Sequence, residues 1–377
     1  MIIVVCVAAV SALSLAIALW ARHRRSQRLQ SASLYVEALK ELIKGREESA
    51  FRYLRRVVAE DTNNVDAYMK LGDIFRRRGE PAKALKIHRQ LSVRADLSAT
   101  DRLELLKSLA QDYMESGKGD KAISTLEELI SQNRKDIWAY QQLLRQYENR
   151  GDWARALSIQ ETVFKINGQK DNALLALYET QIGHQWVAKK EYHKARQKYK
   201  DALRRDRACV PAYLGLGDAY RQENRLSDAI ECWKDLLTNV PEKASLAFGR
   251  LEKALYEKGH FSEVVGLYRD LLERDPKNLR ALLALAVIYE KKGDIDEAIR
   301  ACESALQVEP TSAAARQFLV KFHQLKGDQE KAMENLEMLS SLAEPTRHTF
   351  VCQNCRYESS EPLWHCPQCG RWRTFNL

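Results

Sequence analysis

The fold is decided by stretches such as residues 213–241, YLGLGDAYRQENRLSDAIECWKDLLTNVP. Apolar and small residues recur in it every three or four positions, which is the period of a helix that buries one face. The residues that line the first such face are Tyr213, Leu216, Gly217 and Tyr220. Asn224 follows this face, Ala229 lies on a second one, and Pro241 closes the stretch. The pattern predicts two consecutive helices joined by a tight turn.

The same pattern returns about every 34 residues through the middle of the chain. One small residue recurs, alanine in eight of nine units, at Ala50, Ala84, Ala122, Ala156, Ala195, Ala229, Val264, Ala298 and Ala332. Five positions earlier stand Gly45, Gly79, Gly117, Gly151, Lys190, Asn224, Gly259, Gly293 and Gly327, a glycine in seven of nine. The glycine predicts a left-handed end to the first helix, and the alanine lets the two helices approach closely. Three units end on Pro241, Pro276 and Pro310, which stop the second helix.

This pattern resembles the tetratricopeptide repeat, with its Trp-x-x-Leu-Gly-x-x-Tyr…Ala…Pro signature. The second unit fills the positions with Tyr68, Leu71, Gly72 and Phe75. Nine units cover about residues 31–346 and imply an all-α superhelix that binds segments of other proteins. The register slips by four residues near Ala99–Arg102 and by five near Asp171–Leu175, and we expect longer turns between units there.

The N-terminus predicts a membrane anchor. Residues 2–21 carry no charged side chain, and a helix of about twenty residues spans about 30 Å, enough to cross a bilayer. A cleaved signal is the alternative, but it needs positive charge before the apolar core rather than after it. The flanking arginines are Arg22, Arg24, Arg25 and Arg28. We therefore expect a transmembrane helix at 1–21, a basic segment at 22–30, a periplasmic N-terminus and a cytoplasmic body.

Net charge supports a membrane neighbour rather than nucleic acid. The formal charge is +9, and the four arginines after the anchor account for nearly half of it. An anionic inner leaflet attracts such a segment. We expect no nucleic-acid partner.

Residues 352–370, CQNCRYESSEPLWHCPQCG, carry the second motif. The cytosol keeps thiols reduced, which disfavours two disulfides, and a thioredoxin-like redox pair would need a βαβ context. Two Cys-x-x-Cys pairs match a four-thiolate tetrahedral site, with the spacer between them forming a short hairpin. The predicted ligands are Cys352, Cys355, Cys366 and Cys369, which would hold one zinc or iron ion. His365 is expected beside the site or on the surface, and the isolated Cys209, Cys232 and Cys302 are expected to be packing residues.

Candidate partner-binding residues lie on the walls of the array. Trp138, Gln141 and Arg145 fall on a face turned toward its concave side, and an exposed Trp beside Arg is a typical binding hot spot. Equivalent positions in an earlier unit are Asp73, Arg76 and Arg77. The alternative is that Trp138 packs between neighbouring repeats. His88, His184, His193, His260 and His323 lack partners at catalytic spacing, so we expect surface or groove histidines and no enzyme.

The chain ends on a small basic and aromatic cluster, Arg371, Trp372, Arg373 and Phe375. A nucleic-acid ribbon would use such residues, but the cluster is small. We expect it to pack against the last repeats, because the linker 342–349 is short and contains Pro345.

The order of anchor, basic flank, repeat array and four-cysteine ribbon resembles the lipopolysaccharide assembly protein B family of bacteria. The stretch YVEALKELIKGREESAFRYL after the anchor and DLS at the end of the second unit add to the resemblance. It implies a non-enzymatic adaptor on the inner membrane that couples lipid A synthesis to the FtsH protease, which degrades the LpxC deacetylase. It also implies that residues 347–377 form a rubredoxin-like metal domain.

Arg356 replaces a glycine of the rubredoxin pattern, and the spacer is shorter than in a rubredoxin. Both differences favour a structural zinc or iron clip. Two other functions stay open, a rubredoxin-like electron carrier and a generic scaffold for another membrane complex. A homodimer is also open.

Overall fold

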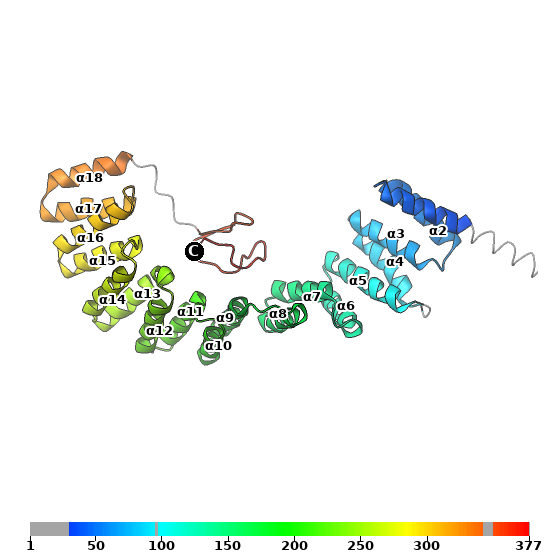
Figure 1. The fold of residues 1–377 in the computed structure, drawn as a ribbon, viewed down its shortest axis with the longest axis horizontal. Helices are drawn as coiled ribbons and strands as arrows, with labels where there is room; N and C mark the ends of the chain where they lie inside the picture. The colour runs from blue at the N-terminus through cyan, green and yellow to red at the C-terminus, as the bar shows by residue number, and fades with distance from the viewer. Residues whose placement is uncertain (1–29, 95–96, 342–349, 377) are drawn as a thin grey trace, which may run out of the picture. The chain divides into compact units, whose positions relative to one another are not determined.

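The computed structural model describes residues 30–94, 97–341 and 350–376 (Figure 1). The expected membrane span at 1–21 and its flanking arginines lie outside these residues. Within the described ranges, no helix is both long enough and apolar enough to cross a membrane.

The described residues form nine helix pairs, which confirms the all-α repeat. In order, the pairs are 30–43 with α2 (Glu47–Glu60), α3 (Val65–Arg77) with α4 (Pro81–Ser92), α5 (Ala99–Glu115) with α6 (Gly119–Gln132), α7 (Ile137–Asn149) with α8 (Trp153–Asn167), α9 (Asn172–Ala188) with α10 (Tyr192–Arg205), α11 (Val210–Gln222) with α12 (Leu226–Asn239), α13 (Phe248–Lys258) with α14 (Phe261–Arg274), α15 (Leu279–Lys292) with α16 (Ile295–Val308), and α17 (Ala313–Lys326) with α18 (Gln329–Ser341). A short 3-10 helix, η1 (Pro241–Leu246), precedes α13. The chain divides into two compact units, up to Tyr147 and from Glu148.

The recurring small residues behave as the sequence predicts. All eight recurring alanines and Val264 are at most 5% exposed, so each lies where two helices meet. The seven recurring glycines all have positive φ, between 67° and 81°. Lys190 and Asn224, which replace glycine, take the same left-handed conformation with φ of 60° and 57°. The backbone of this turn is therefore the same in every unit, whichever residue fills it.

The glycine inside the first helix of a unit makes room for a large side chain. A methyl group on Gly72 would overlap the imidazole of His88, and one on Gly217 would overlap the indole of Trp233. His88 and Trp233 occupy equivalent places on the second helices α4 and α12. Both rings are fully buried. The signature glycine thus lets the second helix insert a ring against the backbone of the first.

Both register slips accompany a longer first helix, and only the slip before α5 also has a longer preceding turn. Before α5 the turn has six residues, 93–98, and before α9 it has four, 168–171, the same number as before α7. Both α5 and α9 have 17 residues, against 13 in α3 and α7. The prediction of a longer turn is right before α5 and wrong before α9, where the extra residues mainly extend the helix by about one turn.

Polar contacts between successive helix pairs accompany the apolar core. Arg77 on α3 contacts Glu47 on α2 at 2.8 Å. In the second of the two compact units, which begins at Glu148, Arg250 on α13 contacts Asp218 on α11 at 2.9 Å. Such partly exposed pairs contribute little each, on the order of 0–1 kcal/mol, so burial of apolar side chains supplies most of the stability.

Candidate metal centre and its contact with the repeat array

The C-terminal ribbon is built around two cysteine turns. Strands β1 (Phe350–Val351) and β2 (Glu358–Ser359) pair in antiparallel fashion on either side of the first turn. An antiparallel β-bridge between His365 and Trp372 encloses the second turn, and a second β-bridge joins the backbones of Cys352 and Phe375. The hairpin expected within the spacer is therefore wrong in detail. The paired strands enclose a cysteine turn, and only β2 lies in the spacer.

The four sulfurs lie close enough to share one ion. All lie within 4.8 Å of one another, with Cys352 and Cys369 at 3.8 Å and Cys355 and Cys366 at 3.6 Å. A tetrahedral ion with metal–sulfur bonds of about 2.3 Å separates its sulfurs by about 3.8 Å. The donor set and its spacing therefore fit a four-thiolate metal ion.

The protonation of the thiols also favours a cation. Burial opposes ionisation of Cys352, but hydrogen bonds from the Thr374 hydroxyl and the N–H groups of Cys355 and Asn354 lower its pKa to about 6. For Cys355, the N–H of Tyr357 lowers the pKa, while burial and the neighbouring sulfurs raise it to about 12. Adjacent thiolates repel each other, so the full set ionises together only around a positive charge.

The two cysteine turns share one backbone geometry despite Arg356. Arg356 has φ of 63° and Gly370 has φ of 67°. Their N–H groups donate to the carbonyl groups of Cys352 and Cys366, at 2.8 and 2.9 Å. Arg356 is therefore compatible with the geometry of the cysteine turn. Its left-handed conformation costs about 1–2 kcal/mol for a residue with a side chain.

An aromatic cluster holds the ribbon against the array. The Trp372 ring lies 4.7 Å from that of Tyr178 on α9 and 5.8 Å from that of Trp153 on α8. The Trp372 N–H donates to the Glu148 carboxylate at 3.1 Å, and the Tyr178 hydroxyl donates to the same carboxylate at 2.5 Å. His365 packs on both indoles, 5.2 Å from Trp153 and 4.6 Å from Trp372, and burial lowers its pKa.

An ion pair lies beside the cluster. Arg373 donates to Asp171 at 2.9 Å, and this hydrogen bond holds the pKa of the Asp171 carboxyl below its usual value. Asp171 also caps α9 by accepting from the N–H of Leu174 at 2.8 Å. Arg373 adopts φ of 57°, so the side chain that reaches the array leaves a strained backbone position.

These contacts correct the expected position of the tail. Trp372 and Arg373 contact α7, α8 and α9, and the expectation that they pack against the last repeats is wrong. Phe375 lies in the core of the ribbon with Cys352 and Cys366. The linker 342–349, from which the expectation was drawn, lies outside the described residues.

The expected hot spot at Trp138 is less open than the sequence suggests. Trp138 is half-buried, and the Lys107 ammonium on α5 lies 6.0 Å from its ring. Gln141 and Arg145 on α7 are exposed. The Trp138 indole therefore lies against the neighbouring repeat. A partner-binding role for Trp138, Gln141 and Arg145 stays a prediction.

The second candidate set is largely engaged within the array. Arg76 pairs with Asp73 and donates to Asp112 at 2.8 Å. Asp112 also lies 2.6 Å from Nδ1 of His88, whose Nε2 lies 3.2 Å from the Met69 carbonyl oxygen. The side chains of His88 and Asp112 are fully buried, so the expectation of a surface or groove histidine is wrong for His88.

His323 is also buried, at 5% exposure, whereas His193 and His260 are exposed. Arg77, the third member of the second candidate set, is half exposed in its ion pair with Glu47. No sequence signal distinguished the buried histidines except the glycine opposite His88.

The isolated cysteines behave as packing residues. Burial raises the pKa of Cys209 to about 11 and those of Cys232 and Cys302 to about 12. Cys209 and Cys302 are at most 3% exposed. Thiols in this state are poor nucleophiles and poor metal ligands.

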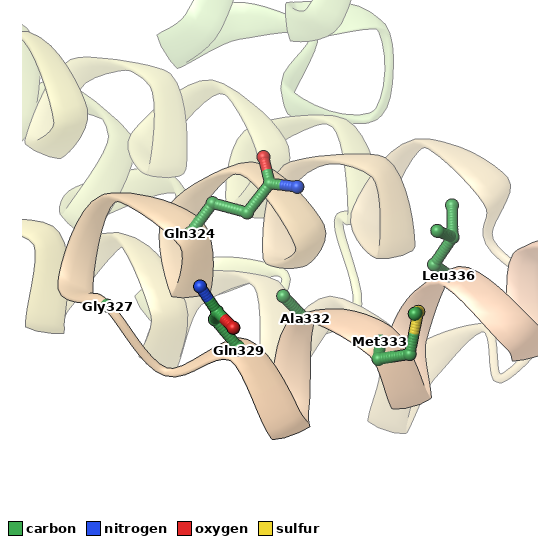
Figure 2. Close-up of a pocket in the computed structure, with 6 residues that line it drawn as sticks. All are labelled: Gln324, Gly327, Gln329, Ala332, Met333 and Leu336. Carbon is green, nitrogen blue, oxygen red and sulfur yellow. The ribbon is translucent and has the colours of Figure 1, made fainter.

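A hollow of about 470 Å³ lies along α17 and α18 (Figure 2). Its lining residues are Gln324, Gly327, Gln329, Ala332, Met333 and Leu336. None of them is ionisable, so the hollow offers no group for acid–base or metal chemistry.

Comparison with known families matches both parts of the chain. A family model described as a rubredoxin metal binding domain matches residues 350–376. Tetratricopeptide repeat models match residues 67–103, 187–250, 253–315 and 291–345. The models thus cover the metal ribbon and parts of the repeat array.

Whole-chain relatives have the same extent. Lipopolysaccharide assembly protein B of Escherichia coli K12 is 25% identical over 343 residues, 90% of this chain and 88% of that protein. The protein of the same name from Haemophilus influenzae is 26% identical over 318 residues, 84% of this chain and 80% of its own. A MamA structure from Desulfovibrio magneticus RS-1 is 18% identical with a TM-score of 0.34, covering 46% of this chain and 96% of that one. With its repeat array, its metal ribbon and relatives matched over most of their length, this chain is similar from end to end to lipopolysaccharide assembly protein B.

Proposed function

We propose that this protein is an inner-membrane adaptor in lipopolysaccharide assembly that couples the LpxC deacetylase to proteolysis by FtsH. The observation that carries the proposal is the match to lipopolysaccharide assembly protein B over 90% of the chain. Arrays of this repeat present extended surfaces for protein segments, which is what an adaptor needs. The protein acts by binding its partners and not by catalysis.

The ribbon has a structural role in this proposal. One zinc or iron ion on Cys352, Cys355, Cys366 and Cys369 stabilises the two cysteine turns. The folded ribbon then presents Trp372 to the cluster on α8 and α9. This contact fixes the surface around these helices, so the metal supports partner binding without taking part in electron transfer.

Membrane attachment completes the proposal. Residues 1–21 cross the inner membrane with the N-terminus in the periplasm, and the basic segment 22–30 stays on the cytoplasmic side. The array at 31–346 and the ribbon at 347–377 then face the cytoplasm. Attachment raises the concentration of the array near a membrane protease. The exposed Gln141 and Arg145 are candidate contacts for the client.

The test is crosslinking in cells followed by purification of the full chain from membranes. LpxC and FtsH should both be recovered with the wild-type chain and with the exposed-site control Arg371→Ala. Cys366→Ser, which removes a metal ligand, should lower the recovery of at least one of them. Recovery of neither protein above a mock purification would contradict the adaptor function.

A further inference from the structure

Positive charge is concentrated in one short part of the array. Residues 189–207, the turn between α9 and α10 with α10 and the start of the next turn, carry nine lysines and arginines and three acidic residues. The segment thus has an excess of six positive charges, more than the four arginines beside the expected anchor, in a chain whose net charge is +9. Helix-end complementarity alone does not require so many cations at the start of a helix, where negative charge is favoured.

Three of the six lysines and arginines of α10 pair with carboxylates outside this helix. Lys198 contacts Glu179 on α9 at 3.0 Å, and Arg205 contacts Glu161 on α8 at 2.7 Å. Arg196 pairs with Glu223. At the α9–α10 turn the situation differs, because no carboxylate among the described residues pairs with Lys189 or Lys190. This turn therefore carries two lysines without a carboxylate partner in the described part of the chain.

An indole lies beside two lysines of this segment, one at the turn and one at the start of α10. The Lys189 ammonium lies 4.9 Å and the Lys194 ammonium 4.8 Å from the centre of the Trp186 ring. Trp186 is half-buried and packs against the core of the second unit. Lys194 also contacts Glu191 at 3.4 Å, with both side chains half exposed. We call Trp186, Lys189, Lys190 and Lys194 the lysine tip.

Lys190 occupies a position at which lysine is conformationally unfavourable. Its φ is 60°, and seven other units have glycine at this position. Glycine adopts this conformation freely, whereas a residue with a Cβ is strained. Residues in such conformations cluster at binding sites, which makes Lys190 a candidate for one.

We propose that the lysine tip binds a carboxylate-rich segment of a protein partner. This rests on the proposed adaptor function, which supplies the need for such a partner. Two ammonium groups lie beside a fixed indole and a third belongs to the same turn, and together they match a segment with several Asp or Glu side chains.

A membrane surface fits the tip less well than a peptide. Trp186 packs against the core and is not free to insert into a bilayer. The charges of Lys200 on α10 and of Glu231 and Asp235 on α12 all act on the Cys232 thiol, so these groups lie near one another. Both carboxylates are exposed. A flat anionic surface that reached α10 would meet these carboxylates, whereas a narrow acidic segment at the tip would not.

The test uses the full chain in a neutral detergent and a short fluorescent peptide of alternating Asp and Glu. Fluorescence anisotropy should show binding that weakens as salt is added, because the contacts are exposed ion pairs. A twin peptide of alternating Asn and Gln should not bind. Vesicles of phosphatidylglycerol serve as the membrane probe.

Matched variants separate charge from backbone effects. Lys190→Gly and Lys189→Gln should each weaken peptide binding about threefold, and both together with Lys194→Gln about tenfold or more. The chain should remain folded with Lys190→Gly, because glycine fills this position in seven units. Asn224→Gly makes the same backbone change at the next turn, where φ is 57°, and should leave binding unchanged.

The inference is overturned if the triple variant binds the acidic peptide as tightly as the wild type, or if the amide twin binds equally well. It is also overturned if the tip binds the vesicles and not the peptide. If LpxC and FtsH are recovered while peptide binding is independent of the tip, this inference fails and the adaptor function stands. If the peptide binds through the tip while neither protein is recovered, the adaptor function fails instead.

Discussion

Replacing Trp372 with alanine tests how the ribbon is held on the array. The substitution removes two ring contacts with the array, to Trp153 and Tyr178, and the hydrogen bond to Glu148. It also removes the ring contact with His365 inside the ribbon. Glu148 retains the Tyr178 hydroxyl as a partner, so the change leaves no unpaired carboxylate. The loss should therefore report the contact itself.

The magnitude follows from these contacts. Each aromatic pair contributes about 0.5–1.5 kcal/mol, and a hydrogen bond to an ionised carboxylate about 1.5–3 kcal/mol. Because Trp372 is only half-buried, we take a value near the lower end of the sum, about 3 kcal/mol. The ratio of docked to undocked ribbon should fall by on the order of a hundredfold.

Hydrogen exchange on the full-length protein measures this ratio. The segment from Trp364 to Trp372, which contains the second cysteine turn, exchanges through the undocked state, so its exchange should accelerate by about the same factor. Trp372→Phe keeps both ring contacts and loses only the donor, so its effect should be smaller. Arg371→Ala removes an exposed neighbour and should have no effect.

Asp171→Asn separates the ion pair from the cluster. Asn still caps α9, but it loses the charge that pairs with Arg373. The pair is about 40% exposed on both sides, so its removal should change exchange by less than about fivefold. Exchange in Trp372→Ala equal to that of the wild type, or a larger effect from Asp171→Asn, would refute the reasoning.

Three further perturbations test the metal site and the two kinds of buried contact. Cys366→Ser should reduce bound metal from one ion per chain to none by elemental analysis, while circular dichroism shows unchanged helix content; retained metal would contradict the ligand assignment. Gly217→Ala should lower the denaturation midpoint by forcing the Trp233 ring aside, at a cost of about 1–3 kcal/mol, with little loss in the Trp233→Leu background. Asp112→Ala should destabilise the first unit by about 3–5 kcal/mol, because it leaves the buried His88 without its carboxylate; a loss below about 1 kcal/mol would count against a charged network.

The repeat was predictable because its determinants are local. A left-handed turn and a close helix contact each depend on one residue and its immediate neighbours, so spacing alone located them. Lys190 and Asn224 show the strength of this logic, since they adopt the glycine conformation without being glycine. The cysteine pairs were predictable for the same reason, because their spacing places four sulfurs together.

The position of the ribbon was not predictable from the sequence. Trp372 and its partner Glu148 are separated by 224 residues, and no periodicity links them. The short linker suggested a nearby docking site, but chain proximity does not determine which surface has matching aromatic rings. The longer α9 was misread for a related reason: an insertion shifts the register in the same way whether it lengthens a turn or a helix.

The burial of His88 was missed because its environment spans three helices. His88 on α4 fits against Gly72 on α3 and bonds to Asp112 on α5. In the sequence, Gly72 reads as a signature residue and His88 as an isolated polar residue. Only their packing shows that the glycine provides the space for the ring.

The lifetime of LpxC in cells tests the adaptor function most directly. Protein synthesis would be stopped and LpxC followed with time, in cells with the full chain, without it, and with it but without FtsH activity. The adaptor function predicts that LpxC disappears faster when the chain is present and that this acceleration requires FtsH. An LpxC lifetime that is unaffected by the chain, or an acceleration that persists without FtsH, would contradict it.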